Sequence, residues 1–133
     1  MFISLLDREQ QEALCKMAQF MVAVDDDRDG REELVVQGLL QESALEEVPE
    51  GAKTVDEVRS LAKKFEEGTA SRALLLELFG VVLADDVAHP EEMKVIQALA
   101  EDLGIDEHWL ERAQDYVQRQ LELQREGLEL LRS

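Results

Sequence analysis

Residues 76–101 read LELFGVVLADDVAHPEEMKVIQALAE, and residues 17–42 read MAQFMVAVDDDRDGREELVVQGLLQE. With a shift of 59 and no gap, nine of the 26 positions are identical. The identical pairs are Phe20/Phe79, Val22/Val81, Asp26/Asp85, Asp27/Asp86, Glu32/Glu91, Glu33/Glu92, Val36/Val95, Leu40/Leu99 and Glu42/Glu101. Each stretch is an apolar helical segment, an acidic turn and an amphipathic segment that opens with two glutamates. The repeat predicts two helical hairpins related by a pseudo-twofold axis.

The rest of the chain carries helix signals and no strand pattern. Thr54 and Glu57 form a capping box, Pro90 suits a first helical position, and Gly104 suits a helix end. Helices are expected over about residues 6–25, 31–45, 55–68, 70–85, 90–104 and 107–131. The fourth is apolar nearly all round, so it is expected to be central. The sequence predicts an all-α single domain over residues 1–133, with about six helices in a compact bundle built from two pseudo-symmetric hairpins.

Composition limits the classes of partner. The net charge is −17, which repels phosphate backbones and anionic membrane surfaces, so neither nucleic-acid binding nor membrane binding is expected. The longest apolar run, residues 74–84, contains Glu77 and is far shorter than the roughly 20 residues of a membrane-spanning helix. Cys15 is the only cysteine, which excludes a disulfide framework and favours the cytoplasm.

Two acidic pairs occur at equivalent places in the two halves. Asp26 precedes Glu33 by seven residues, and Asp85 precedes Glu92 by the same distance. In each pair the Asp ends one predicted helix and the Glu lies near the start of the next, so a tight hairpin brings the carboxylates together. Carboxylates arranged in this way suit calcium, magnesium or manganese. The four acids are therefore the candidate metal ligands.

A purely structural explanation accounts for part of this pattern. Glutamates in a first helical turn stabilise the helix by about 0.3–1 kcal/mol each, because they interact favourably with its dipole and free N–H groups. The same dipole disfavours Asp26 and Asp85 at helix C-termini, so these residues require either a turn-forming role or a ligand role. Helix capping with turn formation and cation binding both stay open.

The sequence contains no complete motif for another metal site, a phosphate-binding loop or a catalytic site. Residues 25–30 match the opening of an EF-hand loop, but Glu32 and Val36 stand where an apolar residue and a bidentate glutamate are required. The chain contains no H-x-x-x-H or E-x-x-H motif and no phosphate-binding glycine loop. No nucleophile stands beside a base at a recognisable spacing, so no enzymatic activity is expected.

The last predicted helix carries a stripe with a coiled-coil-like spacing. The stripe residues are Val117, Leu121, Gln124, Leu128 and Leu131. The stripe either docks on the protein's own core or forms the seam of a homodimer. Two heptads do not decide between these arrangements.

Residues 82–104 resemble a segment of TerB-like proteins, which belong to tellurite-resistance and related bacterial systems. In that segment an apolar helix ends in Ala-Asp-Gly, and a short turn leads to Glu-Glu and an amphipathic helix that ends in Leu-Gly. Ala84 and Asp85 match the Ala-Asp, Glu91 and Glu92 match the Glu pair, and the ending matches at residues 103–104. Asp27 and Asp86 stand where the family usually has glycine.

The resemblance implies a non-enzymatic, all-helical fold with internal pseudo-symmetry, acids that bind metal, and a role in stress-response assemblies. Carried over by position, the metal-binding acids are Asp26, Glu33, Asp85 and Glu92. The expected protein is thus a cytoplasmic TerB-like protein that binds a divalent cation (Ca, Mn or Mg) in a tellurite-type stress response. The alternative is an acidic helical adaptor that binds a protein partner without metal, for which the C-terminal helix offers a surface.

Overall fold

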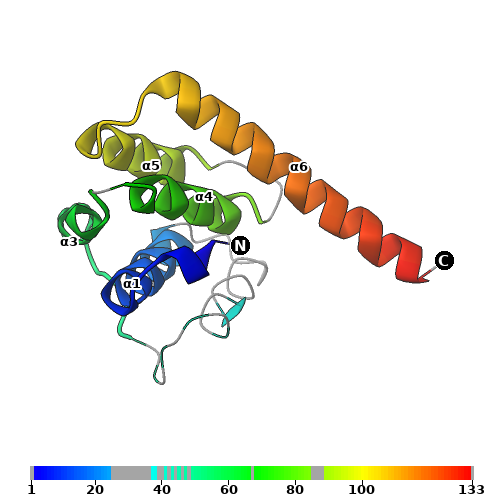
Figure 1. Ribbon diagram of the computed structural model, residues 1–133, viewed down its shortest axis with the longest axis horizontal. Helices are drawn as coiled ribbons and strands as arrows, with labels where there is room; N and C mark the ends of the chain where they lie inside the picture. Colours follow the sequence, from blue (N-terminus) through cyan, green and yellow to red (C-terminus); the bar gives the residue numbers. More distant parts are fainter. Residues whose placement is uncertain are drawn as a thin grey trace.

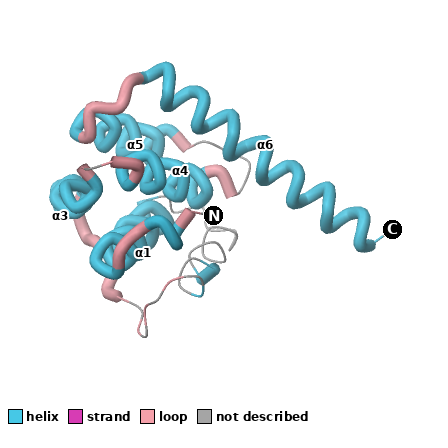
Figure 2. Tube along the Cα trace, in the orientation of Figure 1, coloured by secondary structure: helices cyan, strands magenta, loops and turns pink. Residues whose placement is uncertain are grey.

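A computed structural model shows a bundle of helices in which one helix extends beyond the rest (Figure 1). The structure describes residues 2–24, 37–38, 41, 43, 45, 47, 49–66, 68–84 and 89–132. These residues form five α-helices and two short 3₁₀ helices, and the described part of the chain contains no strand (Figure 2). The predicted all-α class is confirmed. None of the described helices is long and apolar enough to span a membrane.

The first helix begins later than the sequence predicted. Ile3–Leu5 forms the 3₁₀ helix η1, and α1 spans Arg8–Val24 rather than starting near Leu6. Asp7 decides the boundary, because its carboxylate accepts a hydrogen bond from the Gln10 N–H at 2.8 Å. The Gln10 side chain in turn accepts one from the Asp7 N–H at 3.0 Å. This reciprocal cap fixes Asp7 as the residue that precedes α1.

The third predicted helix is present but shorter. Helix α3 spans Val55–Ala62 and passes into the 3₁₀ helix η2 at Lys63–Phe65. Thr54 caps α3 as expected, since its hydroxyl accepts from the Glu57 N–H at 3.1 Å. The Glu57 carboxylate accepts from the Lys53 N–H at 2.9 Å, one residue earlier than a standard capping box requires.

Helix α4 (Ala70–Val82) lies at the centre of the molecule, as predicted. Eleven of its 13 residues are buried, and it contacts η1, α1, α5 and α6. A helix that is apolar on all sides must be enclosed in this way. Phe79 and Leu78 on α4 are fully buried, and so is Leu14 on α1. These contacts make α4 the element around which the others pack.

Helices α5 (Pro90–Asp102) and α6 (Glu107–Arg132) follow the predicted boundaries closely. Gly104 ends the α5 region with a φ of +70°, a left-handed conformation that glycine adopts without strain. Asp106 caps α6, because its carboxylate accepts from the Trp109 N–H at 2.7 Å.

The segment that leads into α3 is docked on α1. The Gln19 side chain donates a hydrogen bond to the Pro49 carbonyl at 2.9 Å, and the Ala52 N–H donates to the Lys16 carbonyl at 3.1 Å. A Cβ atom on Gly51 would lie only 2.9 Å from the Gln19 Cβ. Glycine at this position therefore permits the close approach of the connecting segment to α1.

The internal repeat is described only in part. Its two apolar segments lie in α1 and α4, where Phe20 and Val22 are buried like their counterparts Phe79 and Val81. Most of the second predicted helix, 31–45, lies outside the described residues. The count of six helices and the two pseudo-symmetric hairpins therefore stay predictions, as does the assignment of residues 1–133 to one domain.

An ion pair joins α3 to α5. The Arg59 guanidinium donates two hydrogen bonds to the Asp102 carboxylate, both at 2.7 Å. This fork-to-fork contact is the geometry in which an arginine binds a carboxylate most specifically. The hydrogen bonds and charge of Arg59 lower the pKa of Asp102 below its usual value of 3.8.

We expect Asp102→Asn to reduce the loss of stability in acid. Because the pKa of Asp102 is lower in the folded state than in the unfolded state, its stabilising contribution is present above about pH 4 and is lost as the pH falls through the lowered pKa. Urea unfolding from about pH 6 to pH 2.5 should show a steeper decline for wild type than for Asp102→Asn. Glu111→Gln, which removes an exposed acid of α6, is the control. Parallel declines in wild type and Asp102→Asn would contradict this role of the ion pair.

Candidate functional site

The start of α5 contains the one predicted metal ligand that the structure describes. His89 precedes the helix in an extended conformation, with φ −72° and ψ 130°, and Pro90 is its first residue. The Met93 N–H donates to the His89 carbonyl at 3.0 Å, which closes the first helical turn. Glu91 and Glu92 thus occupy the second and third helical positions, as the sequence predicted.

The two glutamates of this turn have opposite environments. Glu91 is exposed, as expected for an acid that only stabilises the helix dipole, whereas Glu92 is 0% exposed. Burying a carboxylate costs several kcal/mol unless hydrogen bonds or an opposite charge compensate for it. The burial of Glu92 therefore depends on the groups that pack around the start of α5, and the helix dipole, worth about 0.3–1 kcal/mol, contributes only part of their effect.

The other three candidate ligands, Asp26, Glu33 and Asp85, lie outside the described residues. The EF-hand-like run at 25–30 lies there as well. Among the residues that are described, no group of three His, Cys, Asp or Glu side chains is placed to hold a metal ion. The convergence of the four acids therefore stays a prediction.

A second buried carboxylate lies within α4. Glu77 is 4% exposed, and its Oε1 accepts a hydrogen bond from the Phe2 backbone N–H. This bond fastens the segment that precedes η1 to the central helix. In the sequence, Glu77 stands out only as a break in an apolar run. The available signal was a single acid within an apolar helix, which requires a polar partner inside the fold.

A groove with aromatic and arginine side chains lies where η1, α4 and α6 meet. Its volume is about 550 Å³. The lining residues are Phe2, Leu76, Trp109, Arg112, Ala113, Asp115, Tyr116 and Arg119. The rings of Phe2 and Tyr116 lie 6.5 Å apart between centroids, in a tilted arrangement. No sequence pattern predicts this groove, because Phe2 and Leu76 reach α6 only through the tertiary fold.

The described elements define a small all-helical protein in which an apolar helix is enclosed by its neighbours and a buried glutamate opens the helix that follows. The chain belongs to the TerB family, because the family model described as tellurite resistance protein TerB matches residues 37–115. That match covers 79 of the 133 residues and confirms the suspected resemblance. It includes Asp85 and Glu92, but it begins after Asp26 and Glu33. No curated protein and no solved structure gave a significant match.

Proposed function

We propose that this TerB-family chain is a non-enzymatic cytoplasmic protein that binds a divalent cation in a tellurite-type stress response. The proposed ligands are Asp26, Glu33, Asp85 and Glu92. The match to the TerB family model over residues 37–115 is the observation that supports this proposal best, because it includes both Asp85 and Glu92, and Glu92 lies in the first turn of α5. Calcium, manganese and magnesium all accept carboxylate ligands, so the choice of ion is left to experiment.

We expect calcium, manganese or magnesium to raise the melting temperature of the wild-type protein. A ligand that binds only the folded state stabilises it by about 2.7 kcal/mol when its concentration is 100 times its dissociation constant. For a chain of this size that increment corresponds to a rise on the order of 10 °C. Each ion is to be titrated separately into protein that was first treated with a chelator, with melting followed by circular dichroism.

Glu91→Gln and Glu92→Gln form a matched pair for this experiment. Both variants remove one carboxylate from the same turn of α5, but only Glu92 is buried. The stabilisation by the ion should persist in Glu91→Gln and should be lost in Glu92→Gln and in Asp85→Asn. An unchanged melting temperature in the wild type at millimolar ion would refute cation binding. An equal shift in wild type and Glu92→Gln would refute the ligand assignment.

The adaptor function remains the alternative, and the exposed residues of α6 favour it. Seven large apolar side chains are notably exposed among the described residues, and five of them lie on this helix. They are Tyr116, Leu123, Leu128, Leu130 and Leu131. Apolar residues that gather on one element are typical of a protein-binding surface. An adaptor of this kind requires no metal, so chelation should leave its partner binding unchanged.

A further inference from the structure

Helix α6 contains buried residues in its first half and none in its second half. Its buried residues, Leu110, Ala113 and Val117, all belong to its first half, which packs on α4. After Val117 no described residue of α6 is buried, and the helix extends away from the other elements (Figure 1). With a rise of 1.5 Å per residue, residues 118–132 form a rod about 22 Å long. Leu121 near its start still packs against the core, and the turns beyond Arg125 project. Of the predicted C-terminal stripe, Val117 is buried and Leu121 packs against the core, whereas Leu128 and Leu131 are exposed. A homodimer seam along this stripe stays a prediction.

A second stripe runs along another face of the same helix. The stripe consists of residues at intervals of seven: Trp109, Tyr116, Leu123 and Leu130. Each interval of seven residues changes the direction of the side chain around the helix by only about 20°. Trp109 and Tyr116 line the groove, whereas Leu123 and Leu130 are 65% and 70% exposed. We refer to these four residues as the aromatic–leucine stripe. It passes from the groove directly onto the projecting turns.

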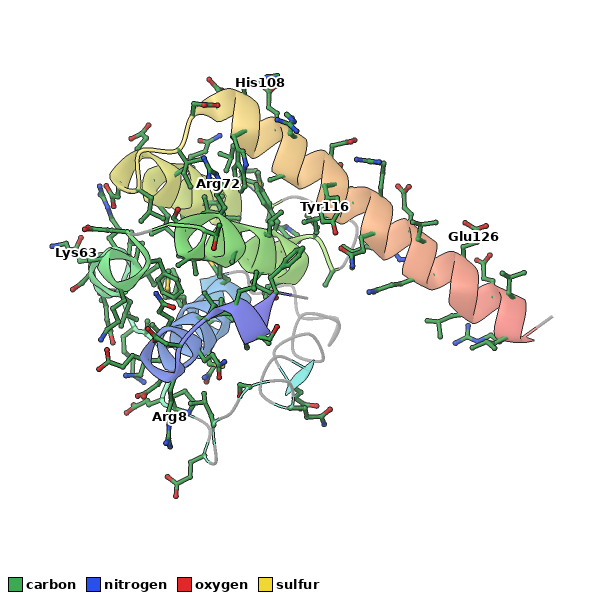
Figure 3. The ribbon with its side chains drawn as sticks, in the orientation of Figure 1. Arg8, Lys63, Arg72, His108, Tyr116 and Glu126 are labelled. Atoms are coloured by element: carbon green, nitrogen blue, oxygen red, sulfur yellow. The ribbon has the colours of Figure 1, made fainter. Side chains whose placement is uncertain are left out.

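The charges of the projecting turns differ from those of the chain as a whole. Residues 118–132 contain three arginines and three glutamates, whereas the whole chain carries a net charge of −17. A segment without net charge approaches a second acidic molecule with little repulsion. Among the charged residues that line the groove, Arg119 is paired with Asp115, and Arg112 is complementary in charge to Glu126, which lies on the projecting turns (Figure 3).

We propose that α6 pairs antiparallel with α6 of a second copy of this chain, so that the leucines of each projecting half occupy the groove of the other copy. The lengths are compatible, because Leu123 and Leu130 are about 10.5 Å apart along the helix axis and the groove-lining part of α6, residues 109–119, is about 15 Å long. Both halves of the contact belong to one surface. Such a surface is self-complementary and closes into a twofold dimer.

The stripe fixes one register for this pairing. When Tyr116 faces Leu123 of the second copy, Trp109 faces Leu130 of the second copy, and the twofold axis crosses α6 near residues 119–120. In the same register, Arg112 lies opposite the position next to Glu126 of the second copy, so the two side chains can pair. Arg119 lies at the axis, where its guanidinium is already paired with Asp115 at 3.0 Å, so two unneutralised arginines do not meet there.

The oligomeric state of the full chain tests this proposal. Sedimentation velocity and light scattering over roughly 1–200 μM cover the affinity range of weak and moderate dimers. The wild type should be dimeric at the upper end of that range. Leu123→Gln combined with Leu130→Gln should raise the dissociation constant at least tenfold. Leu128→Gln is the matched control, because Leu128 is 52% exposed on the same turns but lies on another face of the helix.

A charge exchange tests the register independently. Arg112→Glu should raise the dissociation constant at least tenfold, because it places two glutamates together at each of two symmetric positions. Adding Glu126→Arg to the same chain should restore the dimer. Within one copy these two residues are 14 positions apart on the helix, about 21 Å, so the restoration requires a second copy.

Several outcomes would overturn the proposal. A monomeric wild type at every concentration refutes the dimer, and so does capture of a different protein by a monomeric chain. Disruption by Leu128→Gln alone assigns the seam to the other face of α6, and a failed charge exchange refutes the antiparallel register. The dimer does not depend on cation binding. Measurements with chelator and with added ion therefore keep a failure of one proposal separate from a failure of the other.

Discussion

Phe79→Ala should lower the free energy of unfolding by about 3–5 kcal/mol, the range observed when a large side chain is truncated in a packed core. Phe79 is fully buried on α4, the helix that contacts most of the other described elements. Its removal takes apolar surface out of the core and leaves a cavity that the surrounding structure closes only in part. Because native domains are stable by only about 5–15 kcal/mol, this loss is a large fraction of the total.

Urea unfolding followed by circular dichroism measures this effect, with the midpoint and slope compared between variants. Leu128→Ala is the control, since it truncates an apolar side chain that is already 52% exposed, and exposed substitutions usually change stability by about 0.5 kcal/mol or less. A loss below about 1 kcal/mol for Phe79→Ala would contradict the central position of α4. A large loss for Leu128→Ala in monomeric protein would contradict the projecting state of its helix.

The thiol of Cys15 should be almost inert in the folded protein. Cys15 is 0% exposed on α1. Burial, together with the nearby Glu12 carboxylate, raises the pKa of its thiol to about 11. At pH 8 a thiol with this pKa is ionised in about one molecule in a thousand, compared with about a quarter for an ordinary cysteine. Since the thiolate is the nucleophile, alkylation should be slower by at least about a hundredfold.

Labelling with iodoacetamide at pH 8, followed by mass spectrometry, tests this expectation. The native protein should stay unmodified over a period in which protein unfolded in guanidinium is labelled completely. The rate in the native protein should rise in Phe79→Ala, because a less stable fold exposes Cys15 more often. Rapid labelling of the native wild type would show that Cys15 is accessible and would exclude the buried position.

Local signals allowed much of the fold to be predicted. Thr54, Pro90, Gly104 and Asp106 each act within one helical turn, and the helices that they delimit begin or end close to the predicted positions. The start of α1 lies two residues after the expected position near residue 6. The hydrogen bonds between Asp7 and Gln10 set this boundary, and the apolar spacing alone does not locate it.

Tertiary contacts were harder to predict. The spacing of the C-terminal stripe is the same along its whole length, yet Val117 is buried and Leu131 is 84% exposed. The difference arises because the body of the protein ends part way along α6, and no local pattern encodes that endpoint. The hydrogen bond between Glu77 and Phe2 was missed for a similar reason, since it joins residues 75 positions apart.

The candidate site shows the same limit. Glu91 and Glu92 are adjacent and chemically identical, and both suit the first turn of a helix. Only the packing around α5 makes one exposed and the other buried. The repeat points to this turn, and its role as a cation site stays a prediction. Whether Asp26, Glu33 and Asp85 approach Glu92 depends on segments outside the described residues, and the cation titration tests it directly.

The enclosure of α4 has a consequence for how the chain is made. The helix is covered by η1 and α1, which leave the ribosome before it, and by α5 and α6, which leave after it. Its apolar surface stays exposed until the first half of α6 has been synthesised, since Leu110, Ala113 and Val117 form part of its cover. Nascent chains that stop before Glu107 therefore present an open hydrophobic face to chaperones and proteases. Helix α6 thus also marks the point in translation at which the core can first close.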